Sequence, residues 1–171
     1  DQTETLDLEG RLVLPGFQDT HAHVLDASSE AQGGCQLSPD DQLAQWLRTL
    51  KACAADAEGE WLLGSGFGLH ALLDAKKSPR ELLDGIISDR PVAIMEETSH
   101  SYWLNSRALQ LAGIADDTAD PAGGVILRDP AGKATGVVLD NAGDLALDQA
   151  LPPSKALEEI YYQAVLAGQE E

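Results

Sequence analysis

Two histidines separated by one residue, His21 and His23, are the strongest candidates for chemistry in this chain of 171 residues. They follow an apolar run and a Pro-Gly break in the stretch LVLPGFQDTHAHVL, residues 12–25. Residues two apart in a β-strand point to the same face, so both imidazoles could bind one metal ion. Asp19 falls on that face as well, where it could bind the metal, orient a histidine or do neither. The spacing alone is a weak predictor, because two surface histidines would show it too.

The elements that must position these residues alternate between strands and helices, which predicts an α/β fold. Ser38 and Ser78, each followed by proline, are predicted helix caps. The turn Asp129-Pro130-Ala131-Gly132 predicts a β-hairpin. The expected elements are a hairpin at 3–16, with a short strand at 12–14, helices at 38–59, 78–90, 105–113, 141–151 and 153–168, strands at 60–67 and 91–97, and a hairpin at 123–140.

Composition limits the classes of partner. The chain has 29 acidic and 11 basic residues and a net charge of -18, so it lacks the clustered cations that bind nucleic acid or an anionic membrane surface. It contains no run of the roughly 18 to 20 apolar residues that span a membrane. Cys35 and Cys53 form no C-x-x-C pair, and we expect both to be reduced thiols in a cytoplasmic protein.

The stretch LVLPGFQDTHAH resembles the first barrel strand of the amidohydrolase superfamily, whose members are metal-dependent hydrolases built on a (β/α)8 barrel. The resemblance implies that His21 and His23 are metal ligands and that Asp19 supports them without binding the metal. The preceding DLEGRLVLPG resembles the end of the small β-domain that abuts this barrel.

The rest of the chain is similar to one branch of that superfamily, which includes N-substituted formamide deformylases. The similarity is carried by HSYWLNSRAL in residues 100–109 and by GGVILRDPAGKATGVVLDNA in residues 123–142. This chain departs from the branch pattern at Phe67 and Gly68, where the branch has tryptophan and aspartate. Because of this departure, the details of the substrate pocket in that branch are not carried over to this chain.

The resemblance implies four regions within a barrel hydrolase. Residues 1–15 would end the small β-domain, and 16–25 would be the first barrel strand with the metal motif. Residues 26–150 would form an α/β insert covering the active site, and 151–171 a helix leading back to the barrel. Both ends of the sequence look interrupted, so we interpret the chain as part of a longer protein.

The resemblance also implies an activity. The parent protein would cleave a C–N bond of a small amide or formamide through a water molecule activated by Zn²⁺ or a similar divalent ion. Catalytic zinc needs three protein ligands as a rule, so a chain with two is expected to be inactive without the remainder of the parent chain. A homo-oligomer is left open.

Three further residues are candidates for substrate binding. His100 would border the substrate pocket by the resemblance, although a loop histidine bonded to the backbone is equally simple. Asp140 ends a predicted strand, where it could contact metal or substrate or cap the next helix. His70 follows the glycine-rich GSGFG, in which the absence of a following G-K-[ST] argues against a phosphate loop.

Glu96 and Glu97 are adjacent in a predicted strand and point to opposite faces, so they make a poor catalytic pair.

Two other classes of function stay open. The chain could be a folded binding or structural module without catalysis. It could also be a small self-contained metal hydrolase that uses His21, His23 and either His100 or Asp140 as a three-ligand site.

Overall fold

The structure, a computed structural model, describes residues 7, 9–16, 18, 34–57, 59–150, 162, 163 and 166. Its elements in chain order are β1 (Cys35–Gln36), α2 (Leu43–Asp56), β2 (Leu62–Phe67), α3 (Leu69–Leu73), α4 (Pro79–Asp84), β3 (Val92–Glu96), β4 (Ser101–Leu104), α5 (Ser106–Leu111), β5 (Gly124–Arg128), β6 (Ala134–Asp140) and α6 (Asn141–Ala150). The described residues of the predicted last helix, 162, 163 and 166, are helical.

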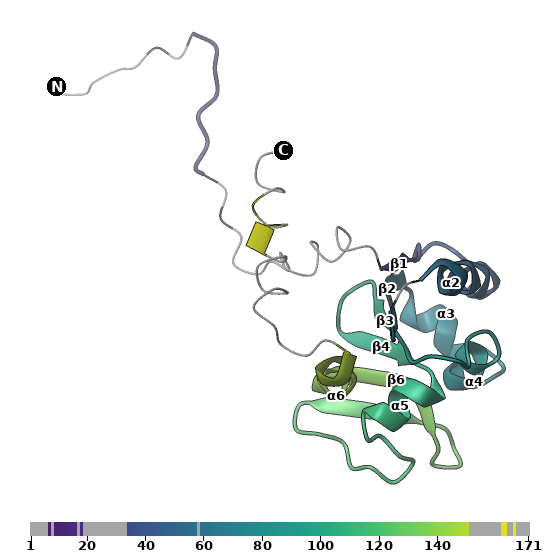
Figure 1. The fold of residues 1–171 in the computed structure, drawn as a ribbon. Coiled ribbons are helices and arrows are strands. Elements are labelled where there is room, and N and C mark those ends of the chain that lie inside the picture. Colours follow the sequence, from purple (N-terminus) through teal and green to yellow (C-terminus); the bar gives the residue numbers. More distant parts are fainter. Residues whose placement is uncertain are drawn as a thin grey trace.

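The strands form one mixed sheet in the order β1-β2-β3-β4-β6-β5 (Figure 1). The first three strands pair in parallel, and β4 runs antiparallel to both β3 and β6. β5 and β6 form the predicted hairpin, whose turn is closed by a hydrogen bond from the Gly132 N–H to the Asp129 carbonyl. The mixed sheet with its helices confirms the predicted α/β class.

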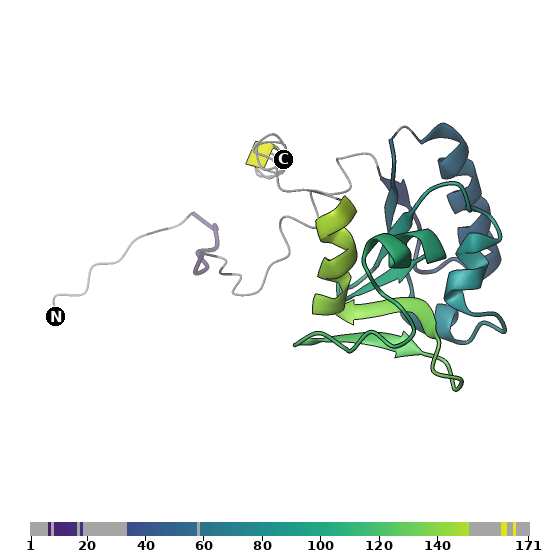
Figure 2. The same cartoon turned by 60° about the horizontal axis from the view of Figure 1, so that its bottom comes forward.

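Helices cover both faces of the sheet (Figures 1 and 2), and alternation along the central strands supplies a core to each face. In β3, Val92 and Ile94 pack with the apolar side chains of α2, α3 and α4, whereas Ala93 between them packs with those of α5 and α6. In β4, Trp103 belongs to the first core and Leu104 to the second. The fold is therefore a helix–sheet–helix sandwich.

A row of three aromatic rings occupies the centre of the first core. Phe67 packs edge-to-face between Trp46 and Trp103, with ring centroids 6.3 Å and 5.7 Å apart, and all three side chains are fully buried. Each indole N–H has a backbone acceptor, the Ser38 carbonyl at 2.7 Å and the Pro79 carbonyl at 2.8 Å. This aromatic row joins α2, β2, β4 and α4 without leaving a buried donor unpaired.

The first helix begins later than its sequence predicts. Its N-cap is Gln42, and Ser38 is not the cap. The residues Ser38-Pro39-Asp40-Asp41 form a separate turn, closed by a hydrogen bond from the Asp41 N–H to the Ser38 carbonyl at 3.0 Å. Proline suits the second position of such a turn as well as the first turn of a helix, and the bond from Trp46 to Ser38 stabilises the turn.

Asn105 caps α5 and also connects it to the start of β3. Its Oδ1 accepts hydrogen bonds from the N–H groups of Ala108 and Val92, and its Nδ2 donates to the carbonyls of Ile87 and Arg90. The side chain is fully buried, and its amide group forms all four of these hydrogen bonds with backbone groups of the chain. Its role is structural, which accounts for it without a place in a substrate pocket.

The strands differ from the prediction in three places. β1 and β4 lie where no strand is predicted, because each is too short for an alternating pattern to be visible in the sequence. The predicted strand at 12–14 is absent, and Leu12, Val13 and Leu14 are 79%, 69% and 63% exposed. A strand requires a hydrogen-bonding neighbour, and no described residue pairs with this segment.

Cys35 and Cys53 form a disulfide bond, so the expectation of two reduced thiols is wrong. Their Cα atoms are 5.8 Å apart, because β1 lies along α2 at the edge of the sheet. A separation of 18 residues with no C-x-x-C motif contains no signal for such a contact. Only the packing of helix against strand brings the two sulfur atoms together.

The glycines of GSGFG serve strand packing. A Cβ added to Gly64 would lie 2.3 Å from the Cys35 carbonyl oxygen, and one added to Gly66 would lie 2.2 Å from that of Leu37. Gly66 also has a φ of +98°, which other residues rarely adopt. These two positions let β1 approach β2 closely, which explains the glycines without a phosphate ligand.

Replacing Asn105 with alanine should lower the free energy of unfolding by about 3 kcal/mol, because four buried backbone groups lose their partner. Urea denaturation of the purified chain measures this. Ser106→Ala is the matched control, since the neighbouring hydroxyl bonds to Asp84 in an exposed position and should cost less than about 1 kcal/mol. Equal effects of the two substitutions would contradict the role of Asn105.

Replacing Gly64 with alanine should destabilise the chain by about 1–3 kcal/mol, since the new methyl group must displace β1. Gly68→Ala is the control in the same segment, because its nearest atom would be 3.6 Å away, an ordinary contact. Thermal unfolding compares the two variants. A Gly64→Ala variant as stable as Gly68→Ala would show that β1 does not pack as described.

Candidate functional site

One edge of the sheet collects the ends of several strands. Phe67, Glu96 and Asp140 are the last residues of β2, β3 and β6, and these strands run in the same direction. β4 runs the opposite way, so His100, which precedes it, lies at this edge too. We call it the carboxyl edge, and it is where open α/β sheets usually bind ligands.

His100 and Asp140, 40 residues apart in the sequence, meet at the carboxyl edge. The Nδ1 atom of His100 lies 3.2 Å from Oδ1 of Asp140, and the Asp140 N–H donates to the His100 carbonyl at 2.8 Å. The side chains are 61% and 52% exposed. A protonated Nδ1 donates to the carboxylate at this distance, which orients the ring. The contact with Asp140 therefore helps to set the direction of the imidazole.

The backbone is strained at Asp140 itself and at Ser99, the residue before His100. Ser99 has a φ of 64° and Asp140 a φ of 49°, in the left-handed region that residues other than glycine seldom enter. Such conformations cost about 1–3 kcal/mol each and concentrate at functional sites. Asp140 directs its carboxylate to His100. Its predicted contact with metal or substrate stays a prediction.

The loop before β5 supports this conformation. The Gly123 carbonyl accepts the N–H of Asn141, and the Asn141 side chain donates to the Ala122 carbonyl at 3.1 Å. Earlier in this loop lies Asp120, which contacts two residues of β5. The Arg128 guanidinium and the Ile126 N–H hold the pKa of Asp120 below its usual value, with the hydrogen bond to Arg128 the larger cause. The residues next to Asp140 are thereby tied to β5.

The structure places the other candidate residues away from the His100–Asp140 pair or gives them other roles. His70 lies on α3, exposed to solvent. Glu96 is 6% exposed and accepts hydrogen bonds from the backbone and hydroxyl of Thr98, so it closes a turn. Glu97 is exposed, and its N–H donates to the Phe67 carbonyl. The expectation that the two glutamates make a poor catalytic pair agrees with these positions.

Asp19, His21 and His23 lie outside the described residues, so their predicted roles stay predictions. Within the part of the chain that the structure describes, no three His, Cys, Asp or Glu side chains are grouped closely enough to hold a metal ion. His100 and Asp140 thus form a pair and do not by themselves make a metal centre.

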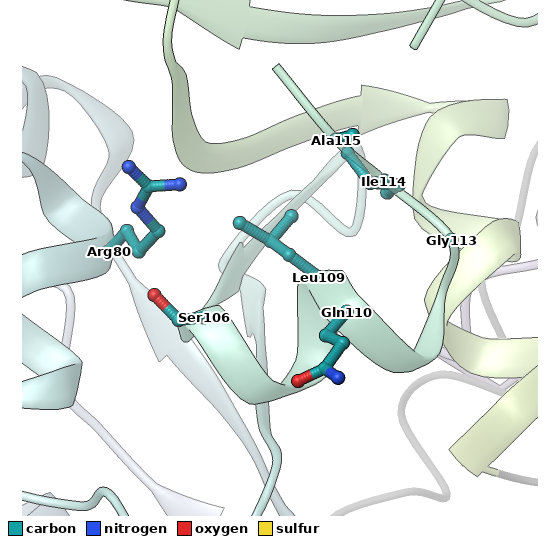
Figure 3. A pocket seen from close by; sticks show the side chains of 7 residues that line it. All are labelled: Arg80, Ser106, Leu109, Gln110, Gly113, Ile114 and Ala115. Atoms are coloured by element: carbon teal, nitrogen blue, oxygen red, sulfur yellow. The ribbon is translucent and has the colours of Figure 1, made fainter. Parts of the chain in front are cut away.

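A separate pocket of about 350 Å³ opens at the other end of β4 (Figure 3). It lies between Arg80 at the start of α4, the residues of α5, and the segment 113–115. The Arg80 guanidinium is 3.7 Å from the carboxylate of Asp116, so this cation already has a partner. No residue predicted to bind metal or substrate lines the pocket.

Sequence reasoning missed the turn that presents His100. Neither the left-handed Ser99 nor the buried Glu96 that bonds to Thr98 is marked by a turn motif. The only available signal was an acidic residue directly after an apolar strand, followed two residues later by threonine. That pattern is too common to indicate a functional turn.

Comparison with known sequences assigns the chain to a family. The sequence model of the amidohydrolase family matches residues 4–170, nearly the whole chain. The chain belongs to the amidohydrolase family. This confirms the resemblance seen in the histidine motif and in the segments around His100 and Asp140.

Amidohydrolase relatives match over most of this chain. A putative amidohydrolase, YtcJ, of Bacillus subtilis is 34% identical over 157 residues, which cover 89% of this chain and 28% of the relative. An N-substituted formamide deformylase of Arthrobacter pascens is 33% identical over 144 residues, 83% of this chain and 27% of the relative. The chain thus spans little more than a quarter of the length of these relatives.

A solved structure shares the fold. An uncharacterized metal-dependent hydrolase from Pyrococcus horikoshii OT3 superposes with a TM-score of 0.53 at 18% identity, over 86% of this chain and 27% of that protein. At this identity the likeness concerns the fold alone. No helix in the described ranges is long and apolar enough to cross a membrane.

Replacing Asp140 with alanine should change the ring ¹⁵N chemical shifts of His100, because the acceptor at Nδ1 is lost. Asp140→Asn keeps an oxygen acceptor and tolerates a positive φ, so it should change them less. Asp140→Ala should lower the stability by about 1–2 kcal/mol, because alanine is disfavoured at a φ of 49°, while the exposed pair itself contributes little. The ring signals of His70 serve as internal control. Unchanged His100 signals in Asp140→Ala would show that the contact does not persist in solution.

Proposed function

We propose that this chain is the amino-terminal part of a metal-dependent amidohydrolase that cleaves a C–N bond of a small amide or formamide. One observation carries the proposal: the family match over residues 4–170 includes the D-x-H-x-H motif at residues 19–23. The substrate class is supported by the relative from Arthrobacter pascens, which is an N-substituted formamide deformylase. The proposal also places the parent protein in the cytoplasm and allows it to form a homo-oligomer.

We assign the metal ligands of this chain to His21 and His23, with Asp19 supporting them. The described residues alone do not fit a metal centre, because they contain no group of three ligands. The remaining ligands would come from the rest of the parent chain. When bound, Zn²⁺ or a similar divalent ion supplies an activated water and polarises the carbonyl of the substrate.

His100 and Asp140 are the residues of the described region that we assign to the substrate. Asp140 orients the imidazole through Nδ1, and the ring then carries a hydrogen-bonding group in a set direction. We keep His70 as a weaker candidate, since it follows β2 on the exposed side of α3.

The region boundaries expected from the sequence form part of the proposal. Residues 1–15 would end a small β-domain, 16–25 would be the first strand of a (β/α)8 barrel, 26–150 the insert covering the active site, and 151–171 the helix returning to the barrel. The exposure of Leu12, Val13 and Leu14 supports this division, because three adjacent apolar side chains call for a partner elsewhere in the protein.

His21→Ala or His23→Ala should reduce the affinity of the 171-residue chain for Zn²⁺ or Co²⁺ by at least about tenfold. Titration calorimetry and the Co²⁺ absorption spectrum measure the affinity. His70→Ala is the control and should bind metal as the unchanged chain does. Metal binding that is indifferent to both His21 and His23 would contradict the assignment and favour an inert folded module.

The isolated chain should show no amide hydrolysis, because two histidines are fewer ligands than catalytic zinc uses. A fluorogenic formamide or amide substrate, incubated with the metal-loaded chain, tests this. Activity that disappears in both His23→Ala and His100→Ala would instead establish a small self-contained hydrolase.

A further inference from the structure

The disulfide between Cys35 and Cys53 connects strand β1 to helix α2. β1 is an edge strand of two residues, paired with β2 through Gly64 and Ser65. Beyond these pairs, the Leu37 N–H donates to the Ser65 carbonyl at 2.8 Å. Among the described residues, the other contacts of β1 include the hydrogen bond from Ser65 Oγ to Gln36 Oε1 at 2.9 Å and the burial of Cys35 and Leu37 in the first core. A two-residue strand at the edge of a sheet is where local opening starts.

α2 does not depend on the disulfide in the same way. Trp46 and Leu50 are fully buried in the first core, and Trp46 packs against Phe67. Burial of such side chains stabilises a helix by itself. Cleavage of the disulfide would therefore leave α2 in place and act on β1.

The two sulfur atoms differ in access. Cys35 is 4% exposed, whereas Cys53 lies half-buried on α2. An attacking thiolate reaches Cys53 first, forms a mixed disulfide with it and releases Cys35 as a thiolate, which takes up a proton. A second thiol then attacks the mixed disulfide and releases Cys53. The protein gains two electrons and two protons, and two external thiols become one disulfide.

We propose that the Cys35–Cys53 bond is a redox-controlled clamp on β1, closed when oxidised and opened by cellular thiols. Where cytosolic proteins contain a disulfide, it is usually transient or redox-sensing. β1 begins 12 residues after His23 in the sequence, so, on the proposed function, the disulfide lies close along the chain to the metal ligands. The bond would thus couple metal affinity to the thiol–disulfide balance.

The first experiment compares the oxidised and reduced forms of the unchanged chain. Reduction should lower the thermal midpoint by about 10 °C, and it should speed amide exchange at Gln36 and Leu37 by at least about tenfold while α2 stays protected. The Cys35→Ala/Cys53→Ala double variant is the control and should not respond to reductant. Unchanged exchange in β1 after reduction, or two free thiols in the air-oxidised chain, would overturn the clamp.

The second experiment tests whether cellular thiols open the bond. Equilibration with glutathione at the reduced-to-oxidised ratio of cytosol should yield the dithiol form, counted by alkylation and mass spectrometry. In single variants, Cys53 in Cys35→Ala should alkylate at least about tenfold faster than Cys35 in Cys53→Ala. A bond that resists this buffer is a permanent crosslink, and the redox control is then wrong.

The third experiment separates the clamp from the proposed function. Zn²⁺ affinity is measured for the oxidised chain and for the Cys35→Ala/Cys53→Ala variant, each with and without His21→Ala. Weaker binding in the variant, abolished by His21→Ala, supports the coupling. Equal binding in both, still dependent on His21, refutes the coupling and leaves the metal site intact. Binding independent of His21 refutes the metal assignment, whereas the exchange experiment still decides the clamp.

Discussion

The contact on which most of this fold depends is the buried row formed by Trp46, Phe67 and Trp103. The three rings come from α2, β2 and β4, and they pack edge-to-face at the centre of one core. Aromatic side chains of this size contribute more buried area than any neighbour, and their edge-to-face packing adds about 0.5–1.5 kcal/mol per pair. Because both indole N–H groups reach backbone carbonyls, the row also sets where the chain before α2 and the start of α4 must lie.

The position of β4 follows from this row and determines the candidate site. Trp103 directs one face of β4 into the aromatic core, while Leu104 enters the other core and Asn105 joins the end of the strand to the start of β3. In the register with β6, Ser101 lies opposite Leu139. The preceding and following residues, His100 and Asp140, then meet at the carboxyl edge.

The same packing explains which local predictions hold. Asn105 caps α5 because its short amide both accepts from the helix and fills a buried position, a preference visible in the sequence. Ser38 shows the same local signal, yet its segment forms a turn, since Trp46 reaches back to the Ser38 carbonyl. The local sequence cannot tell a capping residue such as Asn105 from a turn residue such as Ser38, because the partner that decides between the two roles comes from another element.

The sequence by itself determined the α/β class, most helices, the β5–β6 hairpin and the family, because periodicity, turn residues and short motifs are local properties. It also named His100 and Asp140 as candidates, without indicating that they touch. Only the tertiary structure decided that contact, the strand β4, the disulfide between Cys35 and Cys53, and, among the residues that it describes, the absence of a strand at 12–14. Each of these depends on a neighbour distant in the chain, and a neighbour's presence is settled by packing and hydrogen-bond pairing across the whole sheet.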